Sequence, residues 1–192
     1  MELPLTEQAV LTRYLDVAHD ALLWKLEGLS EYDMRRPLTP TGTNLLGLVK
    51  HVAFVELGYF GPVFDRPALE VPHDQDDPNS DMYALASESV DDVLGWFNAA
   101  RTQAIAAIEE LPLDTHGHVP WWGESNPVTL SQIAVHMVAE LHRHCGQADI
   151  LREQLDGAVG MRPGSENIPD TPADYWSEHC ARLEEIAASV AE

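Results

Sequence analysis

The chain has 192 residues, 45% of them hydrophobic, which suits one domain with a full apolar core. Asp and Glu number 32 against 11 Lys and Arg, giving a formal net charge of −21. A surface this acidic repels phosphate backbones and anionic lipids, so the sequence argues against nucleic acid and membrane as partners. Scarce Lys with abundant Ala, Asp and Glu is also a compositional habit of some host proteomes, and we favour this explanation of the acidic excess.

The cysteines and the N-terminal residues favour a cytoplasmic protein. Cys145 and Cys180 are too few for a disulfide framework and lack the Cys-x-x-Cys spacing of a zinc or redox motif. No basic segment and no long apolar run precede Arg13, and no window reaches the ~18 uninterrupted apolar residues of a membrane span. We therefore expect a single cytoplasmic domain over residues 1–192.

Apolar residues recur at helical spacing in four long segments of the chain. The expected helices, in chain order, are one over about Leu5–Leu29, a second capped by Thr43 or Asn44 and ending at Gly61-Pro62, a third over Ser89–Leu111, and a fourth opened by Thr129 or Ser131 and reaching Leu155. Long loops are expected at 62–87 and 157–172, followed by a short closing helix at about 173–190. With no repeat and no strand-rich region, the pattern predicts an all-α four-helix bundle.

The fourth segment carries the residues most suited to chemistry. Glu140 and His144 are four apart, so on a helix their side chains lie on one face and reach a common point. His144 falls on the apolar stripe of that helix, and Glu140 borders it. A carboxylate near a core is costly unless it is paired or bound to a metal. His136 lies one further turn back on nearly the same face.

A further inward histidine comes from the second segment. His51 shares a face with Leu48, Val55 and Gly58, so it is expected to point into the bundle. Together with Glu140 and His144 it could hold one divalent metal, with open positions left for water or substrate as in catalytic sites. These ligand types suit Zn, Ni, Fe or Co. The alternative is that the Glu–His pair only stabilises its own helix.

Four further stretches of the chain carry recognisable motifs: Trp121-Trp122-Gly123, Glu140 with Arg143-His144, Ala148–Glu153, and the second segment through Leu45–Ala53. In these stretches the chain resembles the mycothiol-dependent branch of the DinB-like superfamily, which is related to the N-terminal domain of maleylpyruvate isomerase. The resemblance implies a DinB-like four-helix bundle in which His51, Glu140 and His144 bind a divalent metal, usually zinc. It also implies mycothiol as cosubstrate, and a homodimer is a reasonable expectation from it. Gln147 departs from the pattern, because relatives often have His there.

The function that this resemblance implies is a metal-dependent thiol S-transferase, in which a metal-activated thiolate attacks a small electrophile. Glutathione or bacillithiol could replace mycothiol in the same chemistry. The absence of a second domain after the bundle argues against maleylpyruvate isomerisation itself. The alternative is a stress-response or small-molecule-binding protein that holds a metal without turnover.

Other residues near the expected site have two possible roles each, and the sequence identifies no catalytic residue beyond the metal ligands. His136, Trp121, Arg143 and Arg152 are candidates for contacting substrate or supporting the ligands. The alternative for Trp121 is that it only packs in the connection between helices, and the alternative for either arginine is a salt bridge to a nearby carboxylate. Cys145 is expected to be a small buried packing residue rather than a nucleophile.

Overall fold

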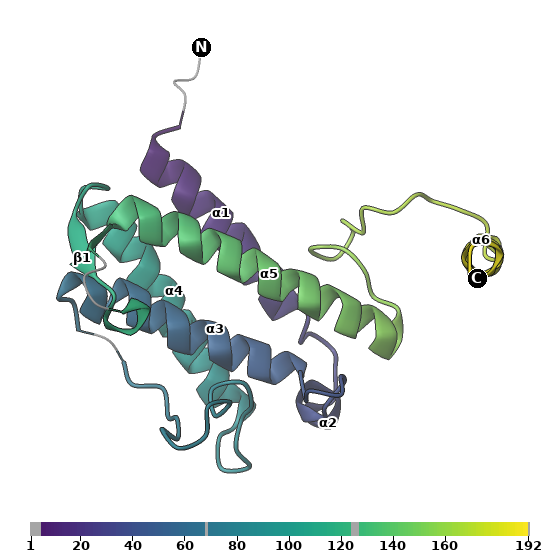
Figure 1. The fold of residues 1–192 in the computed structure, drawn as a ribbon, viewed down its shortest axis with the longest axis horizontal. Helices are drawn as coiled ribbons and strands as arrows, with labels where there is room; N and C mark the ends of the chain where they lie inside the picture. Colours follow the sequence, from purple (N-terminus) through teal and green to yellow (C-terminus); the bar gives the residue numbers. More distant parts are fainter. Residues whose placement is uncertain (1–4, 68, 124–126, 192) are drawn as a thin grey trace.

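A computed structural model describes residues 5–67, 69–123 and 127–191; residues 1–4, part of the N-terminal segment considered above, lie outside it. Figure 1 shows a helical bundle, and this confirms the expected all-α fold. Its long helices are α1 (Glu7–Trp24), α3 (Leu45–Phe60), α4 (Val90–Glu110) and α5 (Leu130–Asp156). A one-turn helix that the sequence did not predict, α2 (Glu31–Arg35), lies between α1 and α3.

The helices begin where side chains can satisfy their first free amides. Of the residues that the sequence offered as caps, Asn44 opens α3 by accepting from the Gly47 amide at 2.8 Å, and Thr129 opens α5. Ser89 opens α4 with a reciprocal capping box. At the other end of α5, Gly157 adopts a left-handed φ of 79°, which favours glycine and stops the helix.

The first helix is shorter than expected. It ends at Trp24 rather than near Leu29, because the amides that follow turn back onto carbonyls three residues earlier. Gly28, with a φ of 75°, continues this tight turn. Apolar periodicity extended the predicted helix too far because Leu26 is still buried within the turn.

The bundle core lies between α3 and its two neighbours, α4 and α5, while α1 packs mainly on α5. Fully buried apolar side chains come from each of these helices, among them Leu15, Leu48, Val52, Phe97, Ala104 and Leu141. Within the described chain, no helix is long and apolar enough to cross a membrane.

A small hairpin closes one end of the bundle. Strands β1 (His116–His118) and β2 (Pro127–Thr129) pair antiparallel, with Gly117 opposite Val128. Strand β1 contacts the short helix η1 (Pro62–Phe64), and a second short helix, η2 (Pro120–Trp122), lies between the two strands in the chain. A Cβ on Gly117 would come within 2.6 Å of the Val63 carbonyl oxygen, so only glycine allows this approach. The sequence did not predict the hairpin, since strands of three residues are too short to show alternation.

The closing helix was expected and is present as α6 (Tyr175–Ser189). It lies apart from the bundle in Figure 1, and none of its residues is buried. The described apolar core ends with Leu151, one turn before the end of α5.

Replacing Phe97 by Ala should lower the free energy of unfolding by about 3–5 kcal/mol, because the ring is fully buried and its loss leaves a cavity. Denaturant unfolding followed by circular dichroism measures this. Tyr32→Ala is the control, since Tyr32 is 73% exposed and its loss should change stability by less than ~0.5 kcal/mol. Equal effects of the two changes would contradict the described core.

Candidate metal centre

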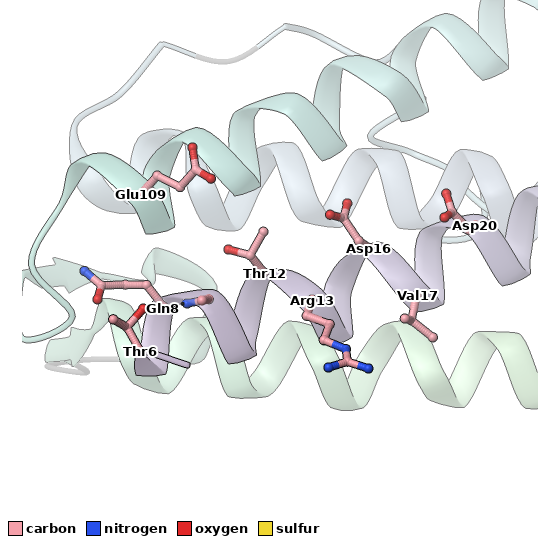
Figure 2. Close-up of a pocket in the computed structure, with 9 residues that line it drawn as sticks. Thr6, Gln8, Thr12, Arg13, Asp16, Val17, Asp20 and Glu109 are labelled. Atoms are coloured by element: carbon pink, nitrogen blue, oxygen red, sulfur yellow. Dashed lines mark hydrogen bonds between the residues drawn. The ribbon is translucent and has the colours of Figure 1, made fainter. Parts of the chain in front are cut away.

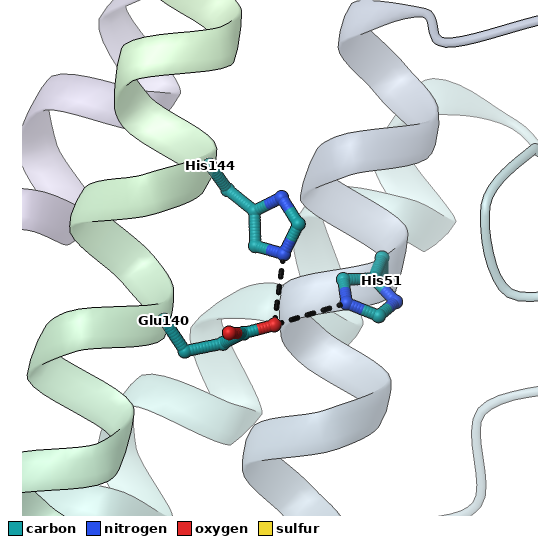
Figure 3. A group of neighbouring side chains, drawn as sticks. All are labelled: His51, Glu140 and His144. Atoms are coloured by element: carbon teal, nitrogen blue, oxygen red, sulfur yellow. Dashed lines mark hydrogen bonds and ion pairs between the residues drawn. The ribbon is translucent and has the colours of Figure 1, made fainter.

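His51, Glu140 and His144 meet where α3 faces α5. Each offers one potential ligand atom, and these atoms lie within 4.8 Å of one another (Figure 3). The Glu140 Oε1 atom is 3.0 Å from Nε2 of His144 and 3.6 Å from Nε2 of His51. Donors bound at 2.0–2.2 Å to a tetrahedral zinc ion would lie roughly 3.4 Å apart, so the spacing suits a metal.

The far nitrogen of each ring is held by an acceptor. Nδ1 of His51 donates to Oδ2 of Asp81 at 2.7 Å, and Nδ1 of His144 donates to Oε1 of Gln147 at 2.7 Å. In a neutral ring with its proton on Nδ1, the lone pair lies on Nε2. If both rings are neutral in this form, two lone pairs and the Glu140 carboxylate face one point, and a cation between them, either a metal ion or a proton on one ring, would satisfy all three groups. The donor set thus fits a metal ion, with outer partners that orient both rings.

The charges around this point also suit a divalent cation. Without a metal, protons on the two rings would supply the positive charge at this point. Burial alone would raise the pKa of Glu140, but hydrogen bonds and charge from protonated His144 and His51 outweigh it and hold the pKa below its usual range. Burial likewise opposes ionisation of Asp81, and the hydrogen bond and charge of His51 again lower its pKa. Both carboxylates are therefore ionised at neutral pH, and their two negative charges would balance a divalent metal.

Sequence reasoning missed Asp81 and left Gln147 without a role. Asp81 ends an acidic stretch that also contains Asp74, Asp76 and Asp77, and nothing in the sequence distinguishes it from them. Gln147 could have been found, because it follows His144 by three residues and so lies on the same helical face.

Aromatic residues cover α5 one turn before Glu140. The ring of His136 packs edge-on against Tyr59 and Trp122, at centroid distances of 5.0 and 5.1 Å. The Tyr59 hydroxyl accepts from Nε1 of Trp121 at 3.2 Å and of Trp122 at 2.9 Å. Tyr59, another residue that the sequence did not single out, therefore organises the cluster, while Trp121 remains 53% exposed.

The two arginines considered above lie in different surroundings. Arg143 is on the exposed side of α5, and no ion pair joins it to the described residues. Arg152 is buried, pairs with Asp156 at 2.8 Å and donates to the carbonyl oxygens of Trp24 and Lys25. These bonds join the end of α1 to α5 and occupy the guanidinium.

A separate groove of about 630 Å³ runs along α1 near α4 (Figure 2). None of the three clustered residues lines it. Its carboxylates at Asp16 and Asp20 pair with Arg101 of α4 at 2.8 and 2.6 Å. The groove is thus a salt-bridged surface distinct from the site, and we assign it no role.

Alkylation of the native protein should modify Cys180 and spare Cys145. The Cys145 thiol is buried and donates to the Ala18 carbonyl oxygen at 3.3 Å, and burial, followed by the charge of Asp149, raises its pKa to about 12. Thiolate is the reactive form, so Cys145 should stay unmodified at pH 8. Peptide mass spectrometry after iodoacetamide treatment measures this, with urea-unfolded protein as the control. Rapid native labelling of Cys145 would contradict the expectation.

Comparison with known proteins gives the chain a family. The model of the mycothiol-S-transferase family matches residues 10–157, which run from α1 to the glycine that ends α5. The match therefore includes all three clustered residues and the hairpin between α4 and α5. A search of the curated proteins finds no match to the chain. Because the family model covers most of its length, the chain belongs to the mycothiol-S-transferase family.

Proposed function

We propose that the protein is a divalent-metal-dependent S-transferase that joins mycothiol to a small electrophile. The observation that carries this proposal is the convergence of three electron-pair donors, with Nδ1 of His51 and of His144 hydrogen-bonded away from the site. Membership of the mycothiol-S-transferase family supports the choice of thiol.

His51 and His144 would hold the metal through Nε2, and Glu140 through its carboxylate. When bound there, a divalent metal would lower the pKa of a thiol that coordinates it, so that thiolate is available at neutral pH. The Glu140 and His51 side chains are 28% and 17% exposed, which leaves the site accessible to a small thiol. The thiolate sulfur then bonds to an electrophilic carbon. Either a leaving group departs with its electron pair, or, where the sulfur adds to one carbon of an activated double bond, the other carbon of that bond takes up a proton from water.

We further propose zinc as the native metal. Two histidines and one glutamate with open positions form a known type of catalytic zinc site, and S-transfer needs no redox change at the metal. His136 and Trp121 are proposed to line the approach for substrate, since their cluster lies one turn along α5 from Glu140. We also propose that the protein acts in the cytoplasm, because thiols are kept reduced there.

Metal content by elemental analysis, followed by titration with mycothiol, tests this function. Wild type should hold about one metal per chain, and His144→Ala should lose it because one of only three ligands is removed. His142→Ala is the matched control and should keep the metal. Its ring lies on the same helix two residues away, but bonds to the Val138 carbonyl oxygen at 2.8 Å. Loss of free thiol in the presence of an epoxide, an alkyl halide and a Michael acceptor then measures turnover.

The outcomes separate the possible functions. Metal-dependent thiol consumption in wild type and in His142→Ala, but not in His144→Ala, is the expected result. A bound metal that mycothiol does not contact would favour a binding protein without turnover. A folded wild type that takes up no metal would overturn the proposal.

A further inference from the structure

The connection between η1 and α4 is fastened to α3 beside the candidate metal centre. Lys50 and His51 are adjacent on α3, and they contact adjacent residues of this connection. Lys50 Nζ donates to the Ser80 carbonyl oxygen at 3.2 Å, while His51 Nδ1 donates to Asp81 at 2.7 Å. Lys50 also pairs with Glu88 at 2.9 Å, and both side chains are almost fully buried. A buried ion pair thus holds this segment in place next to the site.

A close backbone contact adds to this attachment one turn earlier on α3. A Cβ on Gly47 would come within 1.9 Å of the Met82 carbonyl oxygen, so the approach requires glycine. Nδ2 of Asn44 donates to the same oxygen at 3.4 Å. Residues 80–82, which we call the strap, therefore lie against α3 through contacts that do not involve the His51–Asp81 bond.

We propose that Asp81 is a positioning residue, which turns the His51 ring so that Nε2 faces Glu140 and the metal. The ring nitrogen that carries the proton is set by the acceptor that it meets, and a carboxylate on Nδ1 leaves Nε2 free as a ligand. Gln147 does the same for His144 on α5, but it comes from the same helix as its histidine. Asp81 comes from a connection thirty positions later in the chain than His51. The inference rests on the proposed metal function.

The independent attachment of the strap makes the role of Asp81 testable. Because Lys50, Glu88 and Gly47 hold the segment, removal of the Asp81 carboxylate should leave the strap and the bundle folded. The matched control is Asp76→Asn, which removes one negative charge from the same connection. Asp76 is exposed, and none of the described hydrogen bonds or ion pairs uses its carboxylate.

The first measurement needs no metal. Long-range ¹H–¹⁵N spectra of metal-free protein, at a pH where His51 is neutral, report which ring nitrogen carries the proton. Wild type and Asp76→Asn should show His51 with its proton on Nδ1 only. Asp81→Ala should lose this preference, and Asp81→Asn should keep part of it through the amide oxygen. An unchanged His51 tautomer in Asp81→Ala would overturn the positioning role.

The second measurement is zinc affinity by competition with a chromophoric chelator, with cobalt absorption as a probe of coordination. Asp81→Ala should bind zinc about 10–100-fold more weakly than Asp76→Asn, because the loss of a hydrogen-bond partner of a ligand usually weakens metal binding by this factor. The two metal-free variants should have the same thermal stability. Equal zinc affinities would overturn the inference. A wild type that binds no metal would instead remove the proposed function, while the tautomer comparison would still decide whether Asp81 orients the ring.

Discussion

The contact between Glu140 on α5 and the histidine rings on both sides of it is the constraint on which the site depends. One carboxylate oxygen faces a ring nitrogen from its own helix and another from α3, so the site exists only while these helices keep their register. A slip of one residue along either helix would turn its side chains by about 100° and separate the donors. The apolar packing of α3 between α4 and α5 sets this register, and the chemistry therefore relies on the core.

Buried polar pairs add specificity to that packing. His19 of α1 and Glu56 of α3 are both fully buried and meet at 2.9 Å. Lys50 and Glu88 form a second buried pair, between α3 and the residue before the cap of α4. Unpaired, each of these groups would be costly in the interior. Only arrangements that bring the partners together avoid this cost, so the pairs favour one placement of α1 and of the long connection relative to α3.

The matched family region and the structural core end at nearly the same place. The family model stops at Gly157, and the described core stops at Leu151 on the last turns of α5. Helix α6 lies beyond both limits and leaves Trp176, Leu183 and Ile186 exposed. The residues proposed for metal binding and for S-transfer therefore all belong to the part of the chain that the family shares.

Much of the fold could be predicted from the sequence, because each long helix repeats its apolar residues over several turns and begins at a recognisable cap. Asn44 and Thr129 were among the expected caps and serve as such, and Ser89, the expected first residue of the third helix, caps α4. The end of α1 and the hairpin could not be predicted, since apolar residues continue into the turn after Trp24 and each strand has only three residues. These features depend on contacts with other parts of the chain rather than on local periodicity.

Part of the candidate metal centre could likewise be predicted from the sequence, and part could not. Spacing alone placed Glu140 and His144 on one face of a helix, because a helix of fixed pitch brings residues four apart together. The apolar pattern of the second segment, together with the family resemblance, singled out His51 as their partner. Only the tertiary structure decided which nitrogen of His51 faces inward, because Asp81 reaches it from a connection without periodicity. The contacts of Tyr59 with Trp121 and Trp122 at the hairpin end of the bundle were likewise decided by the tertiary structure. Such contacts depend on where distant segments meet in space, and local sequence does not encode that position.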